Sequence, residues 1–304
     1  MRLRVWSFRG VAQPGSAPGL GPGGRGFKSR RPDVRARSST GQSAGFLTQG
    51  LEVRVLPGAL RLSLISLLLI LAGAGAAQSP RAANPERPTV ATHAYAVAPG
   101  YWELEQGFSI RGLHSLREMT SWDLNLKLGL ARGWQLGISG PAYGRTGTGT
   151  GVGDLGVALK ARTDVTSRIA VGVVPGVTLP TGSRRAGLSA GRTLGAVVGV
   201  MSADVAPAWH VDLNLGPTGV GAGAPQWFGS AGVSWSRGPA ALTTEFFGFT
   251  TGGVGPALSG ALVAVLITPG ERVVVDAGGV WGVTWQTPDQ LFLGVTTNLG
   301  RIFE

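Results

Sequence analysis

The stretch Trp209-His210-Val211-Asp212-Leu213-Asn214-Leu215 alternates strictly between apolar and polar side chains. The apolar residues stand at the odd-numbered positions and the polar residues at the even-numbered ones. Trp122–Leu128, which reads WDLNLKL, repeats the scheme. Because successive side chains of a β-strand point to opposite faces of a sheet, both stretches predict strands with one apolar and one polar face.

The same alternation extends outward from these two stretches over most of the chain. From about residue 100 to the end, apolar/polar segments are separated by Gly, Pro, Asp, Asn and Thr. These segments predict twelve strands, near 101–111, 120–131, 133–143, 153–163, 167–179, 194–205, 208–216, 226–236, 240–250, 258–268, 271–282 and 290–303.

Alternation alone does not separate a soluble β-sandwich from a membrane barrel, but strand length does. Strands of soluble proteins average about 5–6 residues, whereas a tilted strand that crosses a bilayer needs about 9–11. Strands in hydrocarbon must pair all their backbone groups, so they span only as a closed barrel, which in bacterial single chains has an even strand number. The predicted fold is therefore all-β, a single antiparallel transmembrane barrel of about twelve strands over residues 100–304.

Tryptophans and connections agree with this prediction. Loops 146–151 and 180–192 are long and polar, as extracellular loops are, whereas Arg132-Gly133 and Pro269-Gly270 predict tight periplasmic turns. Eight tryptophans fall mostly near predicted strand ends, where an interfacial aromatic girdle would lie: Trp102, Trp122, Trp134, Trp209, Trp227, Trp235, Trp281 and Trp285.

Composition excludes several kinds of chemistry. The 304 residues contain no Cys, which removes disulfides, Cys-ligated zinc, iron–sulfur clusters and thiol catalysis. The three histidines have no paired spacing, so no metal site is expected, and no motif indicates a cofactor. The 51 glycines follow no collagen period and suit tight turns and crowded interior positions.

Positive charge is concentrated at the N-terminus. Residues 1–77 carry 11 Lys and Arg against 2 Asp and Glu, whereas residues 78–304 carry 16 against 14. Residues 1–58 are rich in Gly, Pro, Ser and Arg without periodicity, and read as disordered. Segments 26–32 and 52–57 back-translate into the T-loop consensus of a tRNA gene, so we interpret 1–58 as a conceptual translation of two tandem tRNA genes rather than a nucleic-acid-binding arm or a transit peptide.

An export signal follows this region. Arg61 precedes the apolar run Leu62–Leu71, and the small residues Ala72–Ala77 come next. This order is typical of a cleaved secretory signal peptide over 59–77, and the run is shorter than the ~20 residues of a membrane-anchoring helix. Residues 78–99 are then expected to form a periplasmic N-terminal segment.

Polar faces of the predicted strands supply the candidate site. Their side chains are expected to line the lumen, either as a path for a solute or as a charge network that fills and stiffens a narrow barrel. The candidates are Asp123, Asn125, Lys127, Asp154, Lys160, Arg162, His210, Asp212, Asn214, Glu245 and Asp276.

Catalysis is the weaker alternative, because some outer-membrane barrels are hydrolases or acyltransferases. His210 is the best general base on a polar face, with Asp212 and Asn214 beside it. Its nucleophile would have to be a serine such as Ser202 or Ser234, neither of which stands in a nucleophile-elbow motif. We therefore predict that the protein is not an enzyme.

Gly151–Lys160, which reads GVGDLGVALK, is followed by Leu179–Ser183, which reads LPTGS. With Glu245 in mid-strand and a closing strand marked by Pro288, Asp289 and Gly294, these motifs resemble the bacterial outer-membrane transporter family named for a MetA pathway of phenol degradation. The resemblance covers about 100–304 and implies an outer-membrane barrel that takes up aromatic compounds. The chain departs from that family in ending on Glu304 rather than on an aromatic residue.

The expected function is passive movement of a small, aromatic or hydrophobic compound across the bacterial outer membrane. The alternatives are a plugged barrel with a structural or adhesive role and, behind it, a lipid-modifying enzyme. Expected partners are outer-membrane lipid and lipopolysaccharide, the barrel-assembly machinery and a small hydrophobic solute, but not nucleic acid.

Overall fold

The computed structural model describes residues 79–112 and 118–303. The predictions for 1–58 and 59–77 lie outside these residues. Within the described part of the chain, no helix has the length and apolar character needed to cross a membrane.

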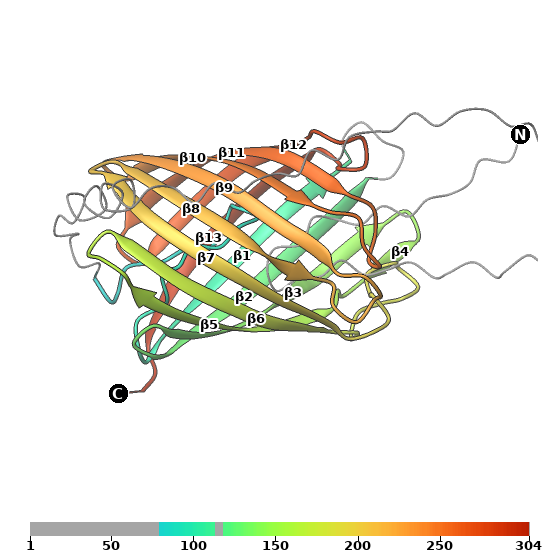
Figure 1. Cartoon of the computed structure of the whole chain (residues 1–304), viewed down its shortest axis with the longest axis horizontal. Helices are drawn as coiled ribbons and strands as arrows, with labels where there is room; N and C mark the ends of the chain where they lie inside the picture. The colour runs from blue at the N-terminus through green and yellow to red at the C-terminus, as the bar shows by residue number, and fades with distance from the viewer. Residues whose placement is uncertain (1–78, 113–117, 304) are drawn as a thin grey trace, which may run out of the picture. The chain divides into compact units, whose positions relative to one another are not determined.

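Twelve long antiparallel strands close into a barrel (Figure 1). Each strand pairs with the next along the chain, and β1 pairs with β13 to close the ring. The short β4 lies outside the ring and pairs only with the end of β3. The strands are β1 (Tyr101–Arg111), β2 (Met119–Ala131), β3 (Trp134–Thr146), β4 (Gly149–Gly151), β5 (Leu155–Asp164), β6 (Ile169–Leu179), β7 (Leu194–Ala206), β8 (Trp209–Thr218), β9 (Gln226–Arg237), β10 (Ala240–Phe249), β11 (Leu258–Gly270), β12 (Val273–Gly282) and β13 (Gln290–Arg301).

The predicted strand number and most predicted boundaries are confirmed, with two local corrections. β5 begins at Leu155, so Asp154 precedes the strand that was predicted to contain it. Pro269 and Gly270 belong to β11, and the turn lies at Glu271 and Arg272. A register shift between Ile267 and Gly270 carries β11 past the proline, which cannot donate a ladder hydrogen bond.

The two ends of the barrel differ in the length of their connections. Short turns, such as Arg132-Gly133 with Gly133 at φ 80°, lie at the left in Figure 1, where the C-terminus also lies. Longer loops lie at the right. We call these the short-turn end and the long-loop end.

Asp154 organises two neighbouring loops at the long-loop end. Its carboxylate accepts hydrogen bonds from the backbone N–H groups of Gly182 (2.9 Å) and Ala190 (2.6 Å). Thr146 adds a bond from its hydroxyl to the carbonyl of Ala186 (2.6 Å). The connections 147–154 and 180–193 are thereby tied together.

The outward face carries large apolar side chains that are exposed on every part of the wall. Trp102, Trp134, Trp209 and Trp235 lie towards the short-turn end, and Trp122, Trp227, Trp281 and Trp285 lie towards the long-loop end. Two aromatic girdles with an apolar band between them are the features of a barrel that faces lipid.

The inward face is divided into two sectors. On β1, β2, β3 and β5 it carries charged and polar side chains, such as Glu103, Glu105, Lys127 and Lys160. On the other strands it carries an apolar cluster, which the expectation of a wholly polar lumen did not include, interrupted by polar residues such as Asn214, Glu245 and Asp276. Its wall members are Ala170, Val174, Val198, Val200, Phe228, Phe247, Leu262, Ala264, Val280 and Phe292.

Leu213 tests the orientation of the wall, because it is 40% exposed near the middle of the outward face of β8. Leu213→Arg would place a charge in hydrocarbon and should destabilise the membrane-inserted barrel by about 2–4 kcal/mol. Urea unfolding in lipid vesicles measures the change, with Leu213→Ala as the matched control. Equal stability of the two variants would contradict a lipid-facing position.

Candidate functional site

Residues 83–98, here called the lumen segment, lie inside the barrel. The segment enters at the short-turn end, where the N–H of Ala83 donates to the carbonyl of Glu271 (2.9 Å). It leaves at the same end, where the N–H of Gly100 donates to the carbonyl of Gly129 (2.8 Å). Between these points it reaches Glu245 in the middle of β10. Figure 1 shows the segment as a teal trace inside the strands.

Side chains of the wall satisfy the backbone of the lumen segment. The carboxylate of Glu245 accepts from the N–H groups of Val90 (2.7 Å) and Ala91 (2.8 Å). The amide of Asn214 both accepts from the N–H of Thr92 (3.1 Å) and donates to its carbonyl (2.9 Å). A backbone that pairs with no strand needs such partners, because an unpaired buried N–H is costly.

Two further wall residues extend this series along the segment. The hydroxyl of Ser202 accepts from the N–H of Ala94 (2.7 Å), and the amide oxygen of Gln135 accepts from the N–H of Val97 (2.9 Å). Both residues are buried. The wall therefore fits one particular path of the segment across several strands.

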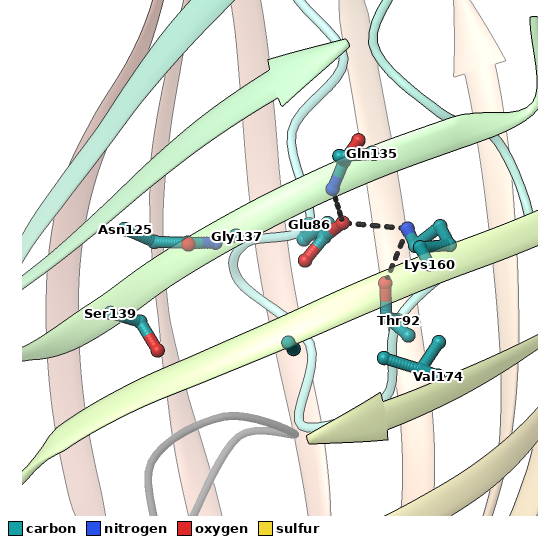
Figure 2. Close-up of a pocket in the computed structure, with 9 residues that line it drawn as sticks. Glu86, Thr92, Asn125, Gln135, Gly137, Ser139, Lys160 and Val174 are labelled. Atoms are coloured by element: carbon teal, nitrogen blue, oxygen red, sulfur yellow. Dashed lines mark hydrogen bonds and ion pairs between the residues drawn. The ribbon is translucent and has the colours of Figure 1, made fainter. Parts of the chain in front are cut away.

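Lys160 forms the first charged centre between wall and segment. Its Nζ lies 2.6 Å from Oε1 of Glu86 and donates to the hydroxyl of Thr92 (3.0 Å) and the carbonyl of His93 (2.8 Å). Figure 2 shows Gln135 donating to the same Glu86 oxygen from the other side (2.8 Å). A cavity of about 20 Å³, which holds about one water molecule, lies beside this centre.

Lys127 forms the second charged centre and is fully buried. Its Nζ lies 3.1 Å from Oε2 of Glu103 and 2.8 Å from Oε1 of Glu105, and it donates to the carbonyl of Asn84 (2.5 Å). Asn125 completes the group by donating to Glu105 (3.3 Å). These wall residues join β1, β2 and the beginning of the lumen segment.

The lysines also set the charge of residues on the segment. Burial alone would raise the pKa of Glu86, but Lys160 and Lys127 together hold it below the usual carboxyl range. Burial is the largest cause that lowers the pKa of His93, to about 3, and Lys160 adds to it. At neutral pH Glu86 is therefore charged and His93 is neutral, with its Nε2 placed 3.0 Å from the carbonyl of Pro85.

His210 is held by two carboxylates rather than by a serine. Its Nδ1 lies 2.7 Å from Asp204 and its Nε2 lies 3.1 Å from Asp212. The hydroxyl of Ser202 donates to Asp212 (2.5 Å), and that of Ser234 donates to Thr243 (2.8 Å). Both ring nitrogens are thus paired with acids, so His210 does not activate either serine in the arrangement described here.

The predicted site residues fall into two groups. Most of them line the region around the lumen segment: Asn125, Lys127, Lys160, Arg162, His210, Asp212, Asn214, Glu245 and Asp276. Arg162 lies 5.5 Å from the ring of Tyr95, and Asp276 pairs with Arg87 (3.3 Å). Asp123 instead accepts from Ser121 (2.8 Å), and Asp154 lies among the loops.

Several residues of this region were not predicted as site residues. They are Arg87, Gln135, Ser202 and the inward-facing phenylalanines Phe228, Phe247, Phe249 and Phe292. The sequence offered one signal, namely glycines at inward positions of long strands, such as Gly107 and Gly294. Glycine in a strand interior often marks a place where another group approaches closely.

A larger cavity of about 890 Å³ lies at the short-turn end. Its lining includes Tyr95, Arg132, Arg162, Asp164 and Asp204, so charges of both signs face it. Among the residues that the structure describes, no group of three or more His, Asp or Glu is arranged to hold a metal ion.

Comparison with known proteins finds similarity in solved structures alone. No protein-family model and no curated protein sequence matches the chain. The COG4313 outer-membrane channel from Pseudomonas putida F1 superposes with a TM-score of 0.51 at 14% identity, over 68% of this chain and 98% of that one. A KdgM porin in complex with disordered oligogalacturonate gives a TM-score of 0.48 at 11% identity, over 65% of this chain and 99% of that one.

The closed wall, the two girdles and the similarity in fold define the class of protein. The chain has a closed antiparallel β-barrel fold, similar to that of the outer-membrane channel above. More particularly, it is a twelve-stranded barrel whose own N-terminal residues 83–98 occupy the lumen.

The role of Glu245 as an anchor can be tested with a single cysteine, because the chain has none of its own. Ala91→Cys places a thiol on the segment, at a position that is 3% exposed. Adding Glu245→Leu leaves two buried N–H groups without an acceptor, at about 1–3 kcal/mol each, so maleimide labelling of the folded barrel should accelerate about tenfold or more. Glu245→Gln keeps one acceptor oxygen and should accelerate labelling less. Equal labelling rates in all three backgrounds would show that Glu245 does not hold the segment.

Proposed function

We propose that the protein is a passive outer-membrane channel for small compounds, and that the lumen segment holds it closed in the state described here. The observation that carries the proposal is how the segment is attached. It pairs with no strand, and it is held by side-chain hydrogen bonds and ion pairs from many strands. Such contacts are individually modest, so the segment can withdraw without opening the wall.

The lumen offers two kinds of surface to a solute. Withdrawal of the segment would expose a polar sector around Lys127 and Lys160 and an apolar sector that includes the stacked rings of Phe228 and Phe249 (centroids 4.8 Å apart). Narrow barrels are filled by side chains or enclose one small ligand, which limits the solute to a small molecule. The apolar sector supports the aromatic substrate class that the MetA-pathway resemblance implies.

A permanently plugged barrel with a structural role is the second candidate. It is favoured by the tight packing of the segment, since Ala94 is fully buried and Val97 is 2% exposed. The two candidates differ in whether loosening the anchors creates a pathway.

Planar-bilayer recording separates them. The unmodified protein should remain mostly closed, whereas the double variant Asn214→Ala, Glu245→Leu should show more frequent openings, because four backbone groups of the segment lose their partners. Ser234→Ala, on the inward face and bonded to Thr243 rather than to the lumen segment, serves as the control. Absence of current from all three proteins, with folded barrels verified by heat-modifiable mobility, would favour the structural role.

We also propose that the chain is exported through the signal peptide at 59–77 and is assembled by the barrel-assembly machinery among outer-membrane lipid and lipopolysaccharide. Mass spectrometry of the protein purified from outer membranes should find an N-terminus near Ala77 or Gln78, without peptides from 5–50. Detection of peptides that contain residues 62–71 in the mature protein would contradict cleavage.

A further inference from the structure

Arg87 belongs to the lumen segment, and its charged side chain contacts Asp276 on β12 of the wall. Its Nε lies 3.4 Å from Oδ2 of Asp276, and its Nη2 lies 3.3 Å from Oδ1. Both side chains are largely buried, at 10% and 1% exposure. This two-point arrangement is the one by which carboxylates recognise guanidinium groups.

Two glycines give this guanidinium its space. Gly294 pairs with Asp276 across β12 and β13, and Gly107 pairs with Gly294 across β13 and β1. The three residues therefore form one row across three neighbouring strands. A Cβ atom at either glycine would overlap the side chain of Arg87, so the row is open only because both residues lack a side chain.

An aromatic ring completes the surroundings. Phe292 lies two residues before Gly294 on the same face of β13, and its ring centroid is 6.0 Å from Cζ of Arg87. A cation near an aromatic face gains electrostatic attraction, more so when both are removed from water. We call Gly107, Asp276, Phe292 and Gly294 the guanidinium slot.

The slot differs from the other anchors of the lumen segment. Glu245, Asn214, Ser202 and Gln135 bond to backbone groups, which every sequence possesses. The slot instead fits one type of side chain, and all its residues belong to the wall on β1, β12 and β13. It would therefore keep its shape and its carboxylate if Arg87 left.

We propose that the guanidinium slot is a binding site for the guanidinium or primary ammonium group of a small solute, and that Arg87 occupies it as a tethered substitute when no solute is bound. A solute that takes the slot removes one anchor of the lumen segment and so favours its withdrawal. A guanidinium binds more tightly than an ammonium, because only the planar group bonds the carboxylate at two points. The passage of that solute through the lumen rests on the channel function proposed above. The binding of the solute in the slot does not depend on that function.

The variant Arg87→Ala leaves the slot empty and provides the test. Guanidinium chloride at millimolar concentration, far below denaturing levels, should raise the melting temperature of this variant in detergent, and the rise should saturate. Urea has a similar shape without charge and should give no saturable rise. The unmodified protein should respond only at higher guanidinium concentrations, because its tethered Arg87 competes for the slot at an effective concentration on the order of millimolar or above.

Matched variants assign the response to the slot. Arg87→Ala, Asp276→Asn removes the charge that binds the cation, and Arg87→Ala, Gly294→Ala places a methyl group in its space. Neither should respond to guanidinium. No saturable rise with Arg87→Ala, or equal rises in the double variants, would overturn the proposal.

A second measurement keeps Arg87 in place and covers the case in which Arg87→Ala does not fold. Labelling of Ala91→Cys should accelerate as guanidinium is raised above the concentration that matches the tethered group, but not with urea at the same concentrations. Equal effects of the two compounds would overturn the proposal. Neither readout measures current, so a barrel that binds guanidinium but never conducts would refute the channel function and leave the slot intact.

Discussion

The requirement that every buried backbone polar group finds a partner governs the whole structure. In the wall it is met by twelve strands that pair in a closed ring, since no edge can remain in hydrocarbon. Inside the wall the same requirement applies to the lumen segment, which forms no ladder of backbone hydrogen bonds with any of the strands around it. There it is met by side chains of the wall. The donors and acceptors on the polar inward face of the barrel are therefore placed to match the backbone groups of the lumen segment.

This complement explains the distribution of charge in the lumen. Glu245 needs no cation beside it, because two backbone N–H groups of the segment act as its donors. Lys127 and Lys160 perform the opposite task, since each binds carboxylates together with backbone carbonyls of the segment. Removing one partner from such a buried set leaves a charge without compensation, which favours a single path of the segment over alternatives.

The sequence predicted the wall well because the wall obeys local rules. Alternation at Trp209–Leu215 and Trp122–Leu128 fixes which side chains face lipid, and strand length fixes the environment. The same rules placed Lys127, Lys160, Asn214 and Glu245 on the inward face. They could not say what these residues bind on the lumen segment, because those partners lie 43 to 155 residues away along the chain.

The lumen segment itself escaped prediction for a related reason. Pro80, Pro85 and Pro88 interrupt any period, and a segment without its own hydrogen-bonding pattern reads as a linker. Likewise, Asp154 lies in an alternating stretch, and its bonds to Gly182 and Ala190 in a loop beyond the next strand are what keep it outside β5.

Glycines at inward positions of the wall give information of another kind, because they mark places where a side chain would overlap another group. At Gly107 and Gly294 an inward side chain would be expected from the alternation of β1 and β13, yet both positions are empty and adjacent. The guanidinium of Arg87 fills the space, and Asp276 beside it supplies the charge. A narrow barrel can thus encode a specific cavity by omitting side chains from one row of its wall, while every backbone hydrogen bond of that row is retained.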